Sequence, residues 1–287
     1  MKAMPMSSEH PTISIIIPCF NDGHYLLEAI QSVATIQNGK NEIIVVNDGS
    51  SEQSTIDTLA DLENLGHRVI HQENAGPGRA RNHGISLARG RYILPLDADN
   101  RLLPEGVDSA VQMLEQDSTI DVAYGDVEFF DGKTGRERVG DFDLRRLLVW
   151  NYIYASSIFS KRIWEQYGGF DDARSTQGFE DWDFWCRIAC AGGKFHYVQQ
   201  ALHEYRVRND SFGAEVASKR DRTLEVIRHI REKRVSIKMG DYLDAFQTWD
   251  PVMEKLRQNP LKSLVSLIVR TYFPKAYSKW VALNYNY

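Results

Sequence analysis

Long apolar runs are missing from this sequence. None of its stretches approaches the roughly 18 uninterrupted apolar residues that a membrane-spanning helix needs, so we expect no such helix. The first eleven residues are polar and lack the apolar centre of a secretory signal. We expect residues 1–11 to form a flexible N-terminal tail.

Cysteine is scarce as well. The three cysteines, Cys19, Cys186 and Cys190, form neither a disulfide framework nor a zinc-ligand pattern. Cys186 and Cys190 stand one helical turn apart, which favours buried, reduced thiols. We therefore expect a cytoplasmic protein.

An excess of positive charge is also absent. The 34 lysines and arginines face 39 aspartates and glutamates, for a net charge of −5, which argues against a nucleic-acid-binding surface. Residues 251–287 are the exception, with six basic side chains against one acidic. Apolar residues recur there at helical spacing, which fits either a helix packed on the preceding domain or a peripheral segment on an anionic membrane.

Short apolar runs alternate with helical patterns in the first hundred residues. The runs that predict strands are 13–18, 42–47, 68–71 and 92–96. The patterns that predict helices between them are 25–34, 53–65 and 77–88. This alternation indicates βαβ units on a parallel sheet, whose ligands bind beyond the carboxyl ends of the strands.

The alternation changes after Asn100. We expect further helices at 104–116, 144–150, 162–167 and 180–191. Strands are expected at 121–130, 156–159 and 195–198, and a helical pattern from 214 onward.

Two aspartates follow the fourth predicted strand. Alternate side chains of an extended chain point to one side, so Asp97 and Asp99 can face one hard cation such as Mg²⁺ or Mn²⁺. An isolated Asp-x-Asp is more often a solvated turn, so the neighbouring motifs decide. Asp48 ends the second strand, where it can bind a nucleobase or a ribose, or belong to a turn whose Ser50 or Ser51 caps the next helix.

Arginines stand at the start of one helix and at the end of the last strand. Arg79 and Arg81 open the helix at 77, a position that favours phosphate, although surface solubility is the alternative. Arg206 and Arg208 alternate along an extended segment and could neutralise a leaving diphosphate. His203 is a candidate metal ligand, but a lone histidine is more often an ordinary hydrogen-bonded side chain.

A second acidic cluster begins the helix at 180. Acids at a helix start are common caps, but here they alternate with aromatic residues that can stack on sugar rings. We expect Asp181 to take a proton from a hydroxyl nucleophile, with a pKa that the positive helix end lowers. Glu180, Trp182 and Trp185 are the expected acceptor contacts.

These segments, taken in order, resemble the family 2 glycosyltransferases, which have the nucleotide-diphospho-sugar-binding GT-A fold. The resemblance covers roughly residues 12–211. It runs through SIIIPCFNDGHYLLEAIQSV, EIIVVNDGSS, NAGPGRARNHGISLARGRYILPLDADN, GGFDD, GFEDWDFWCRIACAGG and YRVR. It implies an α/β GT-A fold with a mostly parallel sheet flanked by helices, followed by a C-terminal helical extension.

The resemblance also implies roles for single residues. Asp181 would be the general base of an inverting transfer, and Asp99 would hold Mg²⁺ or Mn²⁺. The expected nucleotide and donor contacts are Pro18, Phe20, Asn21, Asp48, Arg79, Arg81, Asp97, Ala98, Arg206 and Arg208. Many relatives have a histidine where this chain has Arg208, whose fixed positive charge would weaken the dependence on metal.

The implied enzyme transfers a sugar from a nucleotide-sugar donor, UDP-linked by default, to a glycan or lipid-linked acceptor in cell-surface polysaccharide biosynthesis. The expected divisions are a transferase domain at 12–212, with a nucleotide-binding half at 12–100 and an acceptor half at 101–212, and an extension at 213–287. The alternative is a catalytically silent nucleotide-sugar-binding or scaffold protein. A retaining transferase or a nucleotidyltransferase is a weaker third hypothesis.

Overall fold

The computed structural model describes residues 11–36, 41–173 and 177–208. Residues 1–10 of the expected tail and the expected extension at 213–287, with its basic segment at 251–287, lie outside these ranges. Within them, no helix combines the length and the apolar character needed to cross a membrane.

The first half of the chain forms the predicted parallel sheet. Its strands are β1 (Ile13–Cys19), β2 (Asn41–Asp48), β3 (Arg68–Gln72) and β4 (Tyr92–Pro95). The helices between them are α1 (Gly23–Val33), α2 (Gln53–Asn64) and α3 (Pro77–Leu87). β2 and β4 pair with β1 on either side, and β3 pairs with β2, all in parallel. The expected βαβ units are confirmed.

The second half extends this sheet with mixed strands. Its strands are β5 (Arg101–Leu102), β6 (Val122–Asp131), β7 (Gly135–Glu137), β8 (Ile158–Ser160) and β9 (Phe195–Val207). Its helices are α4 (Pro104–Gln116), α5 (Leu144–Val149), α6 (Lys161–Tyr167) and α7 (Glu180–Cys190). β8 runs antiparallel to both β4 and β6 and so joins the two halves. Among the described residues, the sheet has nine strands in the order β3-β2-β1-β4-β8-β6-β9-β5, with β7 beside β6.

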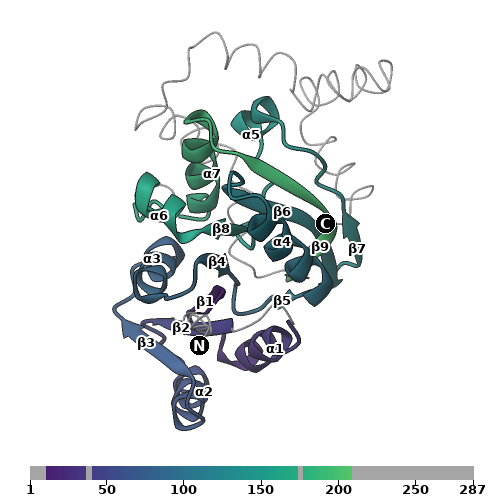
Figure 1. Ribbon diagram of the computed structural model, residues 1–287. Helices are drawn as coiled ribbons and strands as arrows, with labels where there is room; N and C mark the ends of the chain where they lie inside the picture. Colours follow the sequence, from purple (N-terminus) through teal and green to yellow (C-terminus); the bar gives the residue numbers. More distant parts are fainter. Residues whose placement is uncertain (1–10, 37–40, 174–176, 209–287) are drawn as a thin grey trace, which may run out of the picture.

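Helices cover both faces of the sheet, which explains why its strands are apolar on both sides. Ile16 packs in one cluster with residues of α3, α5, α6 and α7. Its neighbours Ile15 and Ile17 face a second cluster with α1, α2 and α4. Figure 1 shows α3, α6 and α7 on one side of the central strands and α1 and α4 on the other. The expected α/β architecture, a sheet flanked by helices, is confirmed.

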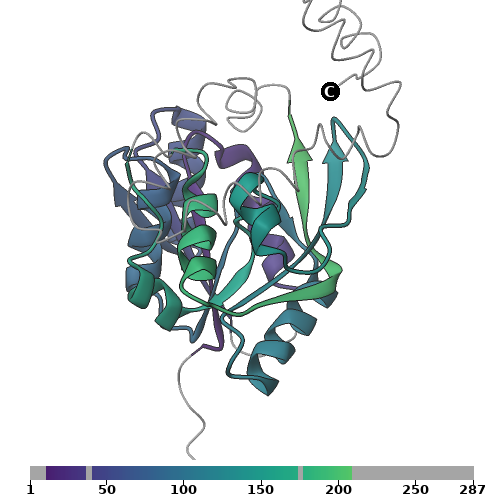
Figure 2. The same cartoon turned by 90° about the horizontal axis from the view of Figure 1, so that it is seen from above.

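The last strand is longer than the sequence indicates. The predicted strand at 195–198 continues to Val207 as β9. Its register against β6 shifts between Gly125 and Asp126, where Val198 and Ala201 are the successive partners. A bulge at the polar pair Gln199 and Gln200 therefore interrupts the apolar pattern without ending the strand. Figure 2 shows β9, in light green, beside the β6–β7 pair.

Candidate active site

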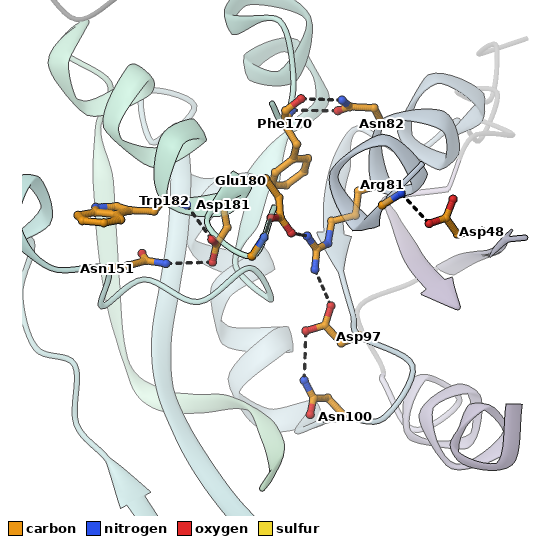
Figure 3. A network of polar contacts seen from close by, with 12 residues as sticks. Asp48, Arg81, Asn82, Asp97, Asn100, Asn151, Phe170, Glu180, Asp181 and Trp182 are labelled. Carbon is orange, nitrogen blue, oxygen red and sulfur yellow. Dashed lines mark hydrogen bonds and ion pairs between the residues drawn. The ribbon is translucent and has the colours of Figure 1, made fainter. Parts of the chain in front are cut away.

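Arg81 joins the two acidic motifs at the carboxyl edge of the sheet. Its Nη2 lies 2.7 Å from Asp97 Oδ1, just beyond β4, and its Nη1 lies 2.5 Å from Glu180 Oε1, the first residue of α7. Figure 3 shows the guanidinium between the two carboxylates. The close packing of α3 on the sheet places it there, because a Cβ at Gly84 would lie 2.5 Å from Ile16 Cγ2.

These contacts correct two expected roles. Arg81 is 4% exposed and its charge is paired with two carboxylates, so it is a buried link rather than an open phosphate ligand. Glu180 is also 4% exposed, and its second oxygen accepts a 2.6 Å bond from the Gly178 amide. With both oxygens engaged inside the protein, Glu180 positions α7 and does not present a carboxylate to an acceptor.

Asp181 is half-buried beside this link. Its Oδ2 accepts a 3.1 Å hydrogen bond from Asn151 Nδ2, and its Oδ1 accepts one of 2.8 Å from the Trp182 amide. Burial, followed by the charge of Glu180, raises the pKa of Asp181 to about 7, against the opposing effects of Arg81 and the two hydrogen bonds. The expected lowering by the helix end is wrong, because desolvation outweighs it. A carboxylate with a pKa near neutrality suits a general base.

The two tryptophans of α7 belong to the core. Trp182 is 2% exposed and donates from Nε1 to the Leu147 carbonyl at 2.6 Å, while Trp185 is 0% exposed. Trp185 packs edge-on against Phe159. Their predicted stacking on an acceptor sugar is therefore wrong, because their rings fill the space between α7 and its neighbours. Trp150, directly before Asn151, is 55% exposed.

Asp99 lies in a second charged group. Arg208 places Nη2 3.1 Å from Asp99 Oδ2 and Nη1 2.9 Å from Asp22 Oδ1. Burial and the charge of Asp97 raise the pKa of Asp99 to about 7, with Arg208 opposing the rise and Asp22 adding to it. The side chain of Asp99 is 15% exposed, so its carboxylate retains some access to solvent.

The donor set is compatible with a hard divalent cation. Asp99 supplies carboxylate oxygen, and the charges of Asp97 and Asp22, which add to the effect of burial on its pKa, are ones that a cation would offset. In the described part of the chain, no three histidine, cysteine or acidic residues are grouped as metal ligands. A metal bound here would therefore take further ligands from water and from a diphosphate, as Mg²⁺ commonly does.

His203 lies inside the protein. It is 2% exposed and its ring packs edge-on against Tyr154, with 5.5 Å between the centroids. Burial lowers the pKa of His203 to about 4, so its imidazole is neutral at pH 7. The structure places it in no group of metal ligands among the described residues.

Arg206 is also committed to internal contacts. Its guanidinium pairs with Glu28 and Asp131, and its Nε donates to the Asp99 carbonyl at 2.9 Å. Its amide donates to Asn100 Oδ1 at 2.9 Å. Arg206 is 7% exposed, so the expected contact with a diphosphate is replaced by a role in ordering the loop around Asp99.

Asp48 orders the loop that enters α3. Its Oδ1 accepts from Gln72 Nε2 and the Ala75 amide at 2.7 and 2.9 Å, and its Oδ2 accepts from the Gly76 amide at 2.8 Å. Gly49, the next residue, has φ +72° and faces the Asn74 backbone, whose nitrogen lies 2.6 Å from where a Cβ would be.

Asn21 connects the loop after β1 to the loop after β2. Its φ is +57°, and its Oδ1 accepts from the amides of Ser51 and Glu52 at 2.8 and 3.0 Å, just before α2. Asn21, rather than Ser50 or Ser51, therefore satisfies these amides. Phe20 beside it is 46% exposed.

The remaining predicted donor contacts lie around this edge without joining the charged groups. Pro18 is half-buried in β1, opposite Val46 of β2. Ala98 is 4% exposed in the loop after β4. Arg79 is exposed on the first turn of α3, and its side chain is outside the Arg81 link.

Sequence reasoning missed Asp22, Asn100 and Asn151. Asp22 directly follows Asn21, and Asn100 directly follows Asp99, so their positions beside predicted site residues could have indicated them. Asn151 stands 30 positions before Asp181 in a loop without a motif, and no pattern pointed to it.

Comparison with known proteins identifies similar sequences and folds. Residues 14–178 match the family model described as glycosyl transferase family 2. An uncharacterized glycosyltransferase of Rickettsia felis is 27% identical over 229 residues. That match covers 76% of this chain and 38% of the relative, so the chain spans less than half the length of this curated protein.

Two solved structures have the same fold. Residues 1–349 of TarS of Staphylococcus aureus, in complex with UDP-GlcNAc, have a TM-score of 0.64 at 17% identity, over 86% of this chain and 76% of that TarS chain. The mannosyltransferase PcManGT of Pyrobaculum calidifontis, in complex with GDP-Man and Mn²⁺, has a TM-score of 0.62 at 16% identity. That alignment covers 96% of this chain and 84% of PcManGT.

Proposed function

This chain belongs to glycosyl transferase family 2, and on that premise we propose that it is an inverting transferase with Asp181 as its general base. The observation that carries the proposal is the setting of Asp181. Its carboxylate is held by Asn151, has a pKa raised to about 7, and stands beside the link from Glu180 through Arg81 to Asp97.

The proposed reaction is a single displacement at the anomeric carbon of the donor sugar. A hydroxyl oxygen of the acceptor forms a bond to that carbon while the bond to the diphosphate oxygen breaks. The hydroxyl proton passes to the Asp181 carboxylate, and the nucleoside diphosphate leaves with the electron pair of the broken bond. Attack opposite the leaving group inverts the configuration of the anomeric carbon.

The donor is proposed to lie along the carboxyl edge of the sheet. Two loops would contact the base and ribose: the one that carries Pro18, Phe20 and Asn21, and the one that follows Asp48. The exposed Phe20 ring offers a stacking surface. Asp97 and Ala98 would contact ribose or donor sugar, with Asp97 oriented by Arg81.

Two cationic groups are proposed to meet the diphosphate. Arg208, which is 20% exposed, lies at the edge of this region, and Arg79 is exposed at the start of α3. A divalent metal held by Asp99, Mn²⁺ or Mg²⁺, would supply positive charge to the leaving diphosphate when bound.

The donor class is proposed to be a UDP-sugar, and the acceptor a glycan or lipid-linked saccharide of cell-surface polysaccharide biosynthesis. The solved TarS complex with UDP-GlcNAc supports a UDP donor. Because PcManGT was solved with GDP-Man, GDP-sugars should be tested beside UDP-sugars. Trp150, exposed beside Asn151, is the proposed aromatic contact for the acceptor in place of Trp182 and Trp185.

We propose the domain division stated above, with transfer carried out by residues 12–212. We also propose a cytoplasmic location in which the basic residues of 251–287 contact anionic lipid at the inner face of the membrane. Flotation with anionic liposomes tests this contact. Unchanged binding after deletion of residues 260–287 would contradict it.

A panel of nucleoside diphosphates and nucleotide sugars in a thermal unfolding assay, with and without Mn²⁺, tests the donor site. A ligand at 100 times its Kd stabilises the folded state by about 2.7 kcal/mol, which the assay detects readily. We expect a response to one nucleotide class. No response to any nucleotide would contradict the proposed function.

A further inference from the structure

Arg208 connects two loops at the centre of the charged edge. Its two terminal nitrogens reach different carboxylates, Asp22 after β1 at 2.9 Å and Asp99 after β4 at 3.1 Å. The guanidinium carbon lies 5.0 Å from the centroid of the Tyr25 ring, which covers one face of the group. These contacts with two carboxylates and an aromatic ring restrict the movement of the planar Arg208 guanidinium.

The backbone before Arg208 is fixed to the same loop. The Arg206 amide bonds Asn100 Oδ1 at 2.9 Å, and Arg206 Nε bonds the Asp99 carbonyl at 2.9 Å. These contacts attach the end of β9 to the loop that carries Asp99. Arg208 is therefore delivered to Asp99 by anchored backbone rather than by a free side chain.

The same carboxylate is the proposed ligand of the divalent cation. Arg208 Nη2 occupies the neighbourhood of Asp99 Oδ2, so a cation at that oxygen would meet an adjacent positive charge. In the second acid of the motif, Asp97 Oδ1 is already paired with Arg81 Nη2 at 2.7 Å. An arginine side chain stays protonated in proteins, so the repulsion between Arg208 and a bound cation does not depend on pH.

We propose that Arg208 competes with the divalent cation for Asp99 and so lowers the metal affinity of the protein without nucleotide. This inference rests on the proposed function in that it takes Asp99 as the metal ligand. It follows that the cation binds appreciably only when a nucleoside diphosphate brings further negative charge and oxygen ligands. Arg208 thereby makes metal binding depend on the donor.

The test is direct Mn²⁺ binding to the full chain without nucleotide, measured by the electron paramagnetic resonance signal of free Mn²⁺. Arg208→Gln should bind Mn²⁺ about tenfold more tightly than the unmodified protein, a typical size for coupling between neighbouring sites. Adding Asp99→Asn to that variant should abolish the gain.

A matched control is the pair formed by the exposed Arg162 and the half-buried Asp121, with 3.0 Å between Nη2 and Oδ1. Arg162→Gln likewise breaks an arginine–aspartate pair, but one that lies away from the site. It should leave Mn²⁺ affinity unchanged. Arg208→Met, which keeps an unbranched stem against Tyr25, repeats the test if the glutamine variant fails to fold.

Affinity in Arg208→Gln and Arg208→Met equal to or weaker than that of the unmodified protein would overturn the proposal. A gain that survives Asp99→Asn would overturn it too. The measurement involves no sugar transfer, so it is separate from failure of the proposed function, which would appear as an absent response to nucleotides.

Discussion

Arg81 Nη1 lies 2.5 Å from Glu180 Oε1, although the two residues are 99 positions apart in the sequence. Both side chains are 5% exposed. The pair connects α3, which packs on the parallel half of the sheet, to α7, whose second residue is Asp181. A buried ion pair thus couples the proposed donor side to the proposed base.

Arg81→Gln should destabilise the protein by about 3–5 kcal/mol, because it leaves the buried carboxylate of Glu180 without a counter-charge. The measurement is the free energy of unfolding in urea. The control is Arg91→Gln, which breaks an exposed pair with Glu115 and should change stability by less than about 0.5 kcal/mol. Equal losses in both variants would contradict a special role for Arg81.

Trp185→Ala should cost about 3–5 kcal/mol of stability, because the ring is 0% exposed in the aromatic core. Trp150→Ala, at a residue that is 55% exposed, should cost less than about 0.5 kcal/mol. Unfolding curves of the two variants compare the sites directly. A stable Trp185→Ala would restore the sequence-based view of Trp185 as a surface contact.

Activity should rise with pH and reach half its maximum near pH 7, because the proposed base must be deprotonated and its pKa is raised to about 7. Asn151→Ala removes a hydrogen bond that lowers the pKa of Asp181, so the acidic limb should move to higher pH. The dependence of kcat/KM on pH measures the midpoint in the unmodified protein and its shift in Asn151→Ala. A limb that stays in place in the variant would show that Asn151 does not act on the base.

Asp181→Asn should make the protein more stable relative to the unmodified chain as pH rises through about 7. A carboxyl whose folded-state pKa is raised stabilises the fold at pH values below its unfolded pKa, and this contribution is lost as pH rises through the folded value. The uncharged amide does not undergo this loss. Thermal unfolding of both proteins at pH 5 and pH 8 measures the difference, and a difference independent of pH would contradict the raised pKa.

The sequence was sufficient to predict the alternating first half of the fold. Runs such as Ile15–Ile17 are apolar at every position because helices cover both faces of the strand, and that pattern is visible without coordinates. The short strands β5 and β7 escaped prediction because two or three residues carry no period. The predicted strand at 195–198 ended too early because the bulge of β9 falls at a polar pair.

The sequence did not indicate which residues the predicted site residues contact. Sequence spacing placed Asp97, Asp99 and the arginines at one edge, but it does not encode that Arg81 and Arg206 are buried among acids. Burial also reversed the expected pKa shift of Asp181, since desolvation depends on tertiary packing rather than on position in a helix.

The most direct test of the central claim is sugar transfer by Asp181→Asn. With the nucleotide sugar identified by thermal unfolding, release of nucleoside diphosphate is measured for the variant and the unmodified protein, alongside the nucleotide Kd of each. Loss of the base should lower turnover roughly 10²- to 10⁴-fold and leave nucleotide affinity unchanged. Turnover by Asp181→Asn within a few-fold of the unmodified protein would contradict the assignment of Asp181 as the base.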